Sequence, residues 1–417
     1  MTPIPAARTG FDWRRLLFVA GPGLVVMLAD TDAGSVITAA QSGAQWGYSL
    51  LLLQFLLIPI LYLVQELTVR LGMVTGKGHA ALISKHFGPV WAWVSVATLI
   101  VSCLGALLTE FSGLTGVGAL MGVPSSLTLA IVVTGLMMMA VTRSYLSVER
   151  IAISVGLFEL VFLGVAWLAH PGLGEVAAGA VKMPIHDPKF LYLASANVGA
   201  VIMPWMVFFQ QASIVERRLT TDDIALARVD TALGAVLTQL VMAAVLVAIA
   251  AALGKAGGGG QSLDTVEQIA SAITPFLGET GGRVLFGLGM LGASLVAAIV
   301  VTLTAARSLA EVIGAKHSLH HTVQEAPWFY GAYAAALVVA AVVVASRVDL
   351  VALSVDVQVM NALLLPIVLT FLFLLARRLP EPYRLQGAYA IVAGVLIAAT
   401  VIFGVYTGLA GLFGQAA

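Results

Sequence analysis

The stretch Leu28-Ala29-Asp30-Thr31-Asp32-Ala33-Gly34-Ser35 places two carboxylates and a glycine inside an apolar run of membrane-spanning length. An ionised Asp at the centre of a bilayer costs roughly 3 kcal/mol on insertion scales, so a chain keeps one only where something compensates the charge. A cation is the simplest compensation. Gly34 and the short polar residues around it weaken a helix, and a broken helix exposes carbonyls that can bind an ion. The stretch therefore predicts a helix break at Gly34 on an ion pathway.

The composition is that of a polytopic membrane protein. The 417 residues are 60% hydrophobic and only 10% charged, whereas soluble domains have about 25% charged residues. The formal net charge is zero and no basic stripe is present, which argues against nucleic-acid binding. The single cysteine, Cys103, rules out a disulfide framework, and without His/Cys clusters a zinc finger is excluded. No phosphate-binding loop or nucleophile motif indicates an enzyme or an ATP-driven pump.

Apolar stretches long enough to cross about 30 Å of hydrocarbon predict about eleven helices. We expect them at residues 16–43, 47–73, 89–121, 126–142, 148–169, 190–214, 224–253, 283–313, 328–346, 350–376 and 387–413. The connections are short, and the longest are 170–189 and 254–282. The second of these includes Gly257-Gly258-Gly259-Gly260 and is expected to be a flexible external loop.

The distribution of Lys and Arg predicts the orientation. Most of the 21 Lys and Arg residues fall on the side of the N-terminus, whereas the other side receives only Lys182, Lys189, Lys255, Arg283 and Arg347. The positive-inside rule then places the N-terminal segment 1–15 in the cytoplasm, and an odd number of helices places the C-terminus outside. We expect a multi-pass protein of a bacterial inner membrane.

A second interrupted helix is predicted five spans later. Gly199-Ala200-Val201-Ile202-Met203-Pro204-Trp205 places a Gly and a Pro inside an apolar run, and Pro204 removes one backbone N–H, which frees the carbonyl of Ala200. A simple proline kink is the alternative interpretation. Two interrupted helices in matching positions favour a five-plus-five inverted repeat. The first repeat would cover 16–169, an external loop 170–189, the second repeat 190–376, and a final helix 387–413.

These motifs resemble those of a known family. Gly21-Pro22-Gly23, Asp32-Ala33-Gly34-Ser35, the segment 41–48 (QSGAQWGY), the segment 70–77 (RLGMVTGK) and Ala200-Val201-Ile202-Met203-Pro204 resemble the motifs of Nramp divalent-metal transporters. The order of spans is similar over essentially the whole chain. The resemblance implies an all-α, LeuT-like (APC superfamily) membrane protein that imports a divalent cation by alternating access, with the ion bound between spans one and six.

The resemblance also implies a set of metal ligands. The family's metal-binding Asp falls on Asp32, its Asn on Ser35, and its metal-binding Met on Met203, with the carbonyl of Ala200 one turn earlier. Gln358, eight residues before Pro366, has the spacing of a family Gln that approaches the ion. Asp30 is an additional carboxylate, and only an unwound backbone would bring Asp30 and Asp32 to one ion. Asp356 is a further candidate ligand if span ten unwinds.

The same alignment changes the expected proton pathway. Glu110 matches the proton-pathway Glu of the family, but the acid three residues earlier is Leu107. The histidines of span six become Trp205 and Gln210. Since these proton-carrying groups are missing, H⁺ coupling is expected to be weak or altered. Two other acids, Glu159 in span five and Asp356 in span ten, are also expected to be deep. Glu66, near the cytoplasmic end, is expected to form a structural ion pair with Arg70 at i,i+4.

The donor set narrows the choice of ion. Carboxylates, a hydroxyl, carbonyls and an amide are hard oxygen ligands suited to Mn²⁺, Mg²⁺ or Ca²⁺, whereas the thioether of Met203 favours a transition metal. We therefore expect Mn²⁺ as the transported ion, with no cofactor and no obligate protein partner beyond the lipid membrane. The alternatives are Mg²⁺ or another divalent cation, or an organic solute on the same fold. Paired carboxylates argue against a solute that bears its own carboxylate.

Overall fold

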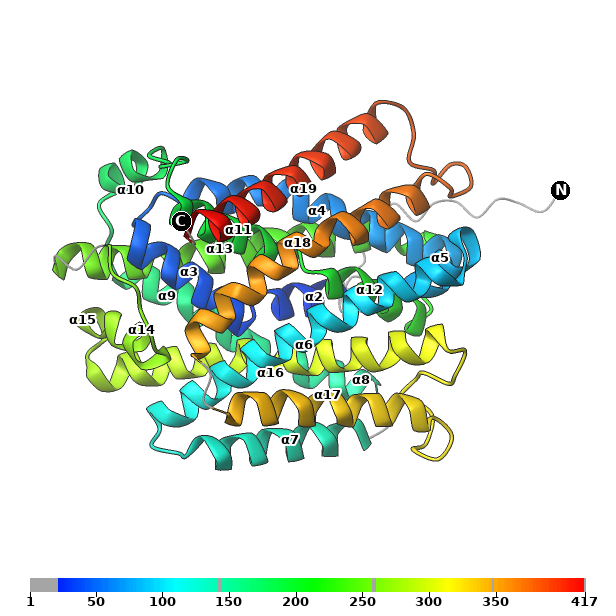
Figure 1. The fold of residues 1–417 in the computed structure, drawn as a ribbon, viewed down its shortest axis with the longest axis horizontal. Helices are drawn as coiled ribbons and strands as arrows, with labels where there is room; N and C mark the ends of the chain where they lie inside the picture. Colours follow the sequence, from blue (N-terminus) through cyan, green and yellow to red (C-terminus); the bar gives the residue numbers. More distant parts are fainter. Residues whose placement is uncertain (1–21, 142–144, 257–259, 347–348, 416–417) are drawn as a thin grey trace.

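Helices form all of the regular structure that the computed structural model describes, which covers residues 22–141, 145–256, 260–346 and 349–415. The predicted N-terminal segment 1–15, Gly21 and Gly257–Gly259 lie outside these residues. The first half of the chain contains α2 (Pro22–Asp30), α3 (Ala33–Trp46), α4 (Leu51–Thr75), α5 (His79–Phe87), α6 (Pro89–Leu120), α7 (Ser125–Val141), α8 (Tyr145–Gly156), the 3₁₀ turn η1 (Leu157–Leu160) and α9 (Val161–Leu168). Figure 1 shows α7 running along the longest axis of the molecule and α6 and α3 inclined to it.

The second half of the chain is also helical. It contains α10 (Leu173–Ala180), α11 (Pro188–Val201), α12 (Pro204–Glu216), η2 (Thr221–Asp223), α13 (Ile224–Ala256), α14 (Val266–Ala272), α15 (Thr274–Leu277), α16 (Glu279–Val312), α17 (Pro327–Ala345), α18 (Leu350–Ala376) and α19 (Gly387–Gln415). The broken pairs α2/α3 and α11/α12 therefore open the two predicted repeats in the same way.

The helices match the predicted spans in position. Among the described residues, nine helical runs are long and apolar enough to cross a membrane, and the bent pair α2/α3 makes a tenth. Helix α7, with 17 residues, is a shorter apolar helix at the remaining predicted span. Because length and composition alone do not establish that α7 crosses the bilayer, the count of eleven and the orientation stay predictions.

The loop prediction for 254–282 is wrong in part. Helices α14 and α15 form within it, and the segment before them is held against α3. The side-chain amide of Gln41 donates to the carbonyl of Leu263 and its oxygen accepts from the Leu263 N–H. A buried amide therefore binds the backbone at Leu263, whereas the predicted flexibility of Gly257–Gly259 falls outside the described residues. The connection 170–189 likewise contains α10.

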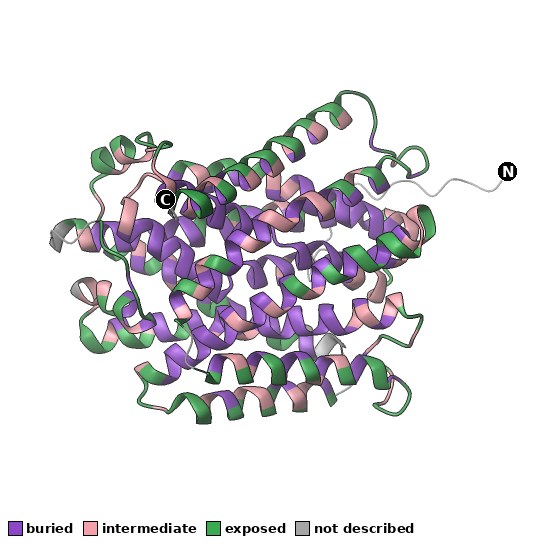
Figure 2. Ribbon diagram, viewed as in Figure 1, coloured by how far each residue is buried: buried purple, intermediate pink, exposed green. Residues whose placement is uncertain are grey.

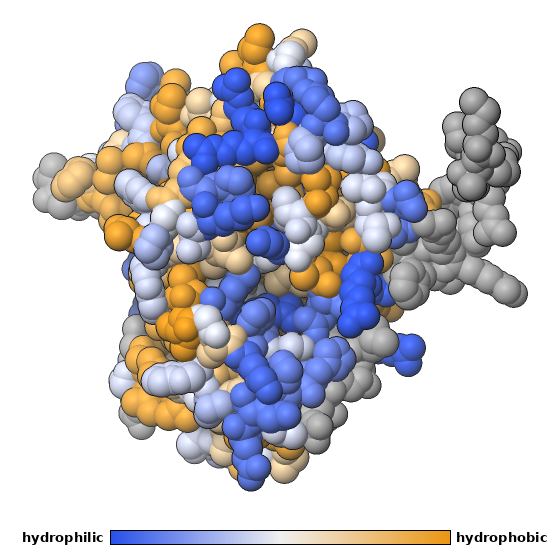
Figure 3. All heavy atoms as spheres, turned by 90° about the vertical axis from the view of Figure 1, so that its right-hand side faces the viewer, coloured by the Kyte–Doolittle hydropathy of each residue, from blue (hydrophilic) through white to orange (hydrophobic). Residues whose placement is uncertain are grey.

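Burial decreases from the centre of the bundle outward. Figure 2 shows buried residues in the central helices and exposed residues along α7, α17 and α19. The exposed side chains on these outer helices include large apolar ones such as Ile131, Met138, Val342 and Ile402. Such a surface would aggregate in water but suits lipid. Figure 3 views the end of the bundle that carries α5, where hydrophilic residues gather. A helical bundle with an apolar outer surface and polar ends is expected of a membrane protein.

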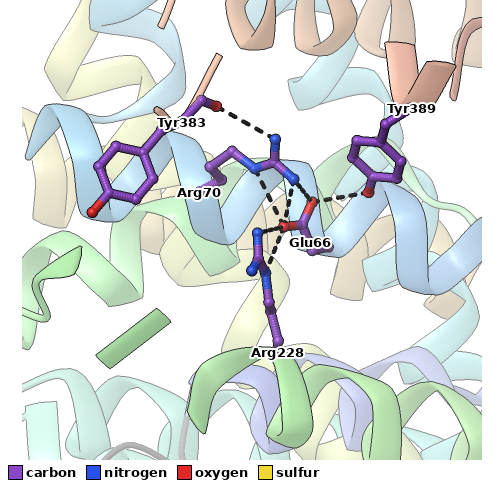
Figure 4. A network of polar contacts seen from close by, with 5 residues as sticks. All are labelled: Glu66, Arg70, Arg228, Tyr383 and Tyr389. Carbon is purple, nitrogen blue, oxygen red and sulfur yellow. Dashed lines mark hydrogen bonds and ion pairs between the residues drawn. The ribbon is translucent and has the colours of Figure 1, made fainter. Parts of the chain in front are cut away.

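A cluster of ionic contacts ties three helices together near that end. The Glu66 carboxylate on α4 lies 2.7 Å from Arg70 on the same helix and 2.7 Å from Arg228 on α13. The hydroxyl of Tyr389 on α19 donates to it at 3.2 Å, and Figure 4 shows these groups converging on one carboxylate. The predicted i,i+4 pair is therefore confirmed. It is part of a larger network that the sequence did not indicate.

Candidate metal site at two helix breaks

The first helix break lies one turn earlier than the sequence predicted. Helix α2 ends at Asp30, α3 begins at Ala33, and the two axes differ by 47°. Asp32 caps α3: its backbone is extended, and its Oδ1 accepts from the Ser35 N–H at 2.6 Å. A short acidic side chain at this position satisfies an otherwise unpaired N–H of the new helix. The Asp therefore starts the second half-helix, and Gly34 is inside it.

Gly34 has a packing role instead. A Cβ at this position would collide with the amide nitrogen of Gln358 and lie 3.2 Å from the hydroxyl of Thr109. The missing side chain therefore lets α18 and α6 approach the break closely. The prediction that Gly34 breaks the helix was wrong because glycine weakens a helix only modestly, whereas the Asp32 cap sets where the helix starts.

The second break is at the predicted place. Helix α11 ends at Val201 and α12 begins at Pro204, with Ile202 and Met203 between them in non-helical conformations. Proline is favoured at the first helical position because its N–H would be unpaired there in any case. Since Pro204 cannot donate to the carbonyl of Ala200, that carbonyl accepts from the Ser35 hydroxyl at 3.0 Å instead. This contact joins the two breaks directly.

Gln358 brings a third helix to the first break. It is fully buried on α18, and its oxygen accepts from Asn361 at 2.9 Å while Ser102 on α6 donates to Asn361 at 2.7 Å. Its amide nitrogen has no hydrogen-bond partner and interacts with the Asp32 carboxylate. The Asn361–Ser102 chain thus fixes which end of the amide faces the break.

Glu110 also faces the first break, from α6. Its Oε2 accepts from the Ala33 N–H at 3.2 Å, and its Oε1 accepts from the Thr109 hydroxyl at 3.2 Å. It also interacts with Asp32. Glu110 therefore touches the start of α3 directly.

Met203 is buried in the second break, and its sulfur accepts a hydrogen bond. The indole N–H of Trp205 donates to the Met203 Sδ at 3.2 Å, and the Met203 N–H contacts the Sδ of Met206 at 3.5 Å. A thioether sulfur has two lone pairs, so the indole leaves one of them free. The position at which the resemblance implied a histidine therefore serves here to orient the methionine.

Asp356 does not belong to this constellation. The expectation that it is deep in span ten is wrong: its side chain is exposed, and its Oδ1 accepts from the Tyr192 hydroxyl at 2.5 Å. Helix α18 continues unbroken from Leu350 to Ala376, so residues two apart point in different directions. Asp356 lines a cavity of about 320 Å³ at the end of the bundle away from α5, together with Asp264 and Asp349.

Glu159 was predicted from the sequence to be deep in span five, but neither its role nor its partner was predicted. Glu159 lies in η1, between α8 and α9, and its Oε2 accepts from the hydroxyl of Thr31, the residue between the two halves of span one. The Thr31 hydroxyl also lies 3.1 Å from the Leu28 carbonyl, which is the alternative acceptor for its single proton. A lone carboxylate in an apolar span was the only signal available for this contact.

Four buried carboxylates thus surround the first break, and no buried cation within the described residues faces them. Asp30, Asp32, Glu110 and Glu159 are each at most 1% exposed, while the one buried Lys or Arg among the described residues is Arg70, which binds Glu66. Both oxygens of Asp30 and one oxygen each of Asp32 and Glu159 have no hydrogen-bond partner. Within the described part of the chain, no three His, Cys, Asp or Glu side chains converge as a metal cluster. A metal here would need mixed ligands.

Comparison with known proteins identifies the family. A profile described as "Natural resistance-associated macrophage protein-like" matches residues 23–410. The chain belongs to this Nramp-like family. One relative, the divalent metal cation transporter MntH of Ralstonia nicotianae, is 31% identical over 300 residues, which cover 67% of this chain and 66% of that protein. The match therefore spans just under two thirds of the relative's length. MntH 1 of Pseudomonas aeruginosa matches to the same extent.

Solved structures confirm the fold of this Nramp-like chain. The Eremococcus coleocola manganese transporter superposes with a TM-score of 0.76 at 18% identity, over 99% of this chain and 90% of that one. A Na⁺-coupled sialic acid symporter superposes with a TM-score of 0.62 at 13% identity, over 94% and 89%. The prediction of an all-α membrane transporter fold of the LeuT type is therefore confirmed, and the protein is an integral multi-pass membrane protein.

Proposed function

We propose that this Nramp-like protein is a secondary transporter that imports a divalent metal ion through alternating access, with the ion bound between the two helix breaks. The observation that carries the proposal is the buried Asp32 carboxylate. It has one oxygen without a hydrogen-bond partner, and it lies in a broken helix next to Ser35, whose hydroxyl contacts the Ala200 carbonyl of the other break. A buried negative charge with no basic partner among the described residues is stable only if it is neutralised, and a cation does so.

The ligands would be Asp32, Ser35, the Ala200 carbonyl, Met203 and Gln358, whose amide would have to turn so that its oxygen rather than its nitrogen faces the ion. Ser35 and Ala200 satisfy each other in this structure, so metal binding would exchange their hydrogen bond for two ligand bonds. Four of these donors are hard oxygens that suit Mn²⁺, Mg²⁺ and Ca²⁺ alike. The sulfur of Met203 interacts better with a softer ion, so we propose Mn²⁺ as the main substrate and Mg²⁺ as the alternative.

The ion would enter from the end of the bundle away from α5. Two adjoining cavities there, of about 320 and 440 Å³, share Asp264 and Asp349, and Glu267 lines the larger one. Carboxylates at the mouth of a cleft raise the local concentration of cations and the rate of their entry. In the predicted orientation this end faces the outside of a bacterial inner membrane.

The opposite end is held closed by contacts of α12. Glu216 lies 2.6 Å from Arg307 on α16 and accepts from the Ser318 hydroxyl at 2.6 Å. Gln211 donates to the Lys77 carbonyl at 2.8 Å and pairs with His79 at 2.9 Å. Release of the ion toward the cytoplasm would require these contacts to separate, because they join the second half-helix of span six to the rest of the bundle.

Proton coupling would be altered rather than typical of the family. Glu110 is retained beside the start of α3, where it could bind a proton as the ion moves. Leu107, Trp205 and Gln210, however, replace groups that the resemblance implied as proton carriers, and Trp205 and Gln210 are fully buried here. Glu110 alone would move at most one proton per cycle.

The test is uptake by proteoliposomes that contain the purified protein and an internal pH dye. Mn²⁺, Mg²⁺ and Ca²⁺ are compared at equal concentrations, with the Asp32→Ala variant as the site control. We expect saturable Mn²⁺ uptake with little acidification and none by the variant. Uptake of none of the three ions by folded wild-type protein, or equal uptake by the variant, would overturn the proposal and favour an organic solute.

A further inference from the structure

We propose that Asp30, Thr31 and Glu159 form a second cation site, distinct from the metal site, that takes Na⁺. The site lies where span one is broken and span five contains its 3₁₀ turn. It rests on different residues from the metal ligands, so it goes beyond the proposed metal transport.

The first support is a set of buried oxygens that lack partners. Neither Asp30 oxygen has a hydrogen-bond partner, nor does the Oε1 of Glu159, and each atom is shielded from solvent. Carboxylate oxygens left unpaired in a low-dielectric interior are costly, so these three atoms indicate a missing positive charge. Asp30 is within electrostatic range of both Asp32 and Glu159, so one monovalent cation would neutralise Asp30 and Glu159 together with a single proton held by the pair.

The second support is local geometry that holds these oxygens together. Thr31 links the two acids, because it follows Asp30 in the chain and its hydroxyl donates to Glu159. The 3₁₀ turn η1 interrupts span five at Glu159, and such turns inside a long helix are frequent at functional positions. The carboxyl end of α2 also points its partial negative charge at this place, which favours a cation.

The third support is the separation from the metal site. Asp32 contacts Ser35, and it interacts with Glu110 and Gln358, whereas Asp30 has no hydrogen bond to any of these residues. Asp30 and Asp32 leave the backbone on either side of Thr31, where the helix is broken. The two sites would therefore share the break and use different ligands, while lying close enough for Asp32 to act electrostatically on Asp30 and Glu159.

The chemistry of the donors selects the kind of ion. Two carboxylates, a hydroxyl and the Leu28 carbonyl next to it are all hard oxygens, and no sulfur or imidazole is among them. The three side chains are at most 1% exposed, so a bound ion must shed its water, which Mg²⁺ does reluctantly. A second divalent ion next to the first would meet twice the Coulomb repulsion that a monovalent ion meets. These conditions favour Na⁺.

The experiment measures binding of ²²Na⁺ to the purified full-length protein in metal-free buffer, with choline as the replacement cation. Wild-type protein should bind Na⁺ saturably. Glu159→Gln and Thr31→Val should each weaken binding by about tenfold or more, which corresponds to about 1.4 kcal/mol. Glu279→Gln is the matched control, because Glu279 is an exposed carboxylate that pairs with Arg283 at the end of α16. It should bind Na⁺ like the wild type.

Absence of Na⁺ binding by folded wild-type protein, or unchanged binding by both Glu159→Gln and Thr31→Val, would overturn the proposal. Two site variants are used so that a folding defect in one leaves the other as a test, and each variant is checked by size-exclusion chromatography. Mn²⁺ binding to the wild type without Na⁺ is measured separately. Na⁺ binding without Mn²⁺ binding would support this site while contradicting the proposed metal transport, and Mn²⁺ binding without Na⁺ binding would do the reverse.

Discussion

Two groups of buried carboxylates in this protein have opposite surroundings. Glu66 is 2% exposed, and both of its oxygens have partners in Arg70, Arg228 and Tyr389, which lie on three helices. The charge is neutralised by the protein itself, and the cluster joins α4, α13 and α19. Such a carboxylate has no capacity left for a ligand.

The acids at the first break are equally buried, but none of the basic residues that the structure describes pairs with them. Asp30, Asp32 and Glu159 all keep at least one oxygen without a hydrogen bond. The contrast between Glu66 and these acids shows that burial of a charge alone does not indicate a binding site in a membrane protein. What marks the site is burial without a partner, because the protein then depends on an ion that comes and goes.

The largest effect is expected from Asp32→Ala. Removing this carboxylate deletes the one ionised ligand at the proposed metal site and the cap of α3, so Mn²⁺ uptake should fall by about 1000-fold or more, equivalent to about 4 kcal/mol. Uptake of Mn²⁺ into proteoliposomes measures it. Asp32→Asn keeps the cap but not the charge and should fail nearly as completely. Normal uptake by Asp32→Asn would show that the charge is not required.

The next largest effect is expected on the stability of the fold, where the paired carboxylate Glu66 and the unpaired carboxylate Asp30 should respond differently to neutralisation. Glu66→Gln leaves Arg70 buried without its counter-charge and should destabilise the fold by about 3–5 kcal/mol. Asp30→Asn should leave stability in Na⁺-free buffer unchanged or raise it, because it removes a buried charge that has no partner. Unfolding in detergent, followed by intrinsic fluorescence against temperature, separates the two. Equal losses in both variants would contradict the contrast between the clusters.

Much of the fold could be predicted from the sequence, because the spans and the second break depend on interactions between residues that are close together in the chain. Apolar length places the spans, and Pro204 places the second break, since proline acts on its own backbone. The first break was predicted within a few residues, but its cause was wrong, because whether Asp32 or Gly34 sets the helix start depends on a hydrogen bond to Ser35. Asp356 was misplaced for a similar reason, since its exposure depends on how α18 faces its neighbours.

The partners of the buried acids could not be predicted. Thr31 and Glu159 are 128 residues apart in sequence, and Glu66 and Arg228 are 162 apart. Composition shows that these charges are in apolar spans but not which of them meet. Distinguishing the paired cluster from the unpaired one therefore required the packing of the helices.

A smaller effect concerns pH at the closed end of the bundle. Burial lowers the pKa of His79, which lies on α5, to about 4, although its bond to Gln211 partly opposes the shift. The folded state holds this group neutral while the unfolded state protonates near pH 6.5, so its contribution to stability is present above pH 6.5 and is lost as pH falls toward 4. The loss should reach roughly 3 kcal/mol.

Thermal unfolding of wild type and His79→Gln between pH 7 and pH 4 tests this. The difference in stability between the two proteins should change in favour of the variant as pH falls. A constant difference over this range would show that His79 does not couple stability to pH, and that the contacts of α12 to Gln211 are independent of protonation.

The smallest effect is expected from Met203→Ala. Loss of the thioether removes the one soft ligand, so discrimination of Mn²⁺ over Mg²⁺ should fall by about tenfold, or about 1.4 kcal/mol. Competition of Mg²⁺ with Mn²⁺ uptake measures it. Trp205→Phe, which frees the sulfur from its indole donor, should change selectivity in the opposite direction. Unchanged selectivity in both variants would reduce Met203 to a packing residue.

The most direct test of the central claim is the effect of Mn²⁺ on the unfolding temperature of the purified protein. A ligand that binds only the folded state stabilises it in proportion to the logarithm of its concentration. We expect Mn²⁺ to raise the unfolding temperature of the wild type and of Glu279→Gln in this way, and to leave that of Asp32→Asn unchanged. Equal stabilisation of Asp32→Asn and the wild type would contradict the claim that the unpaired carboxylate at the first helix break binds the metal.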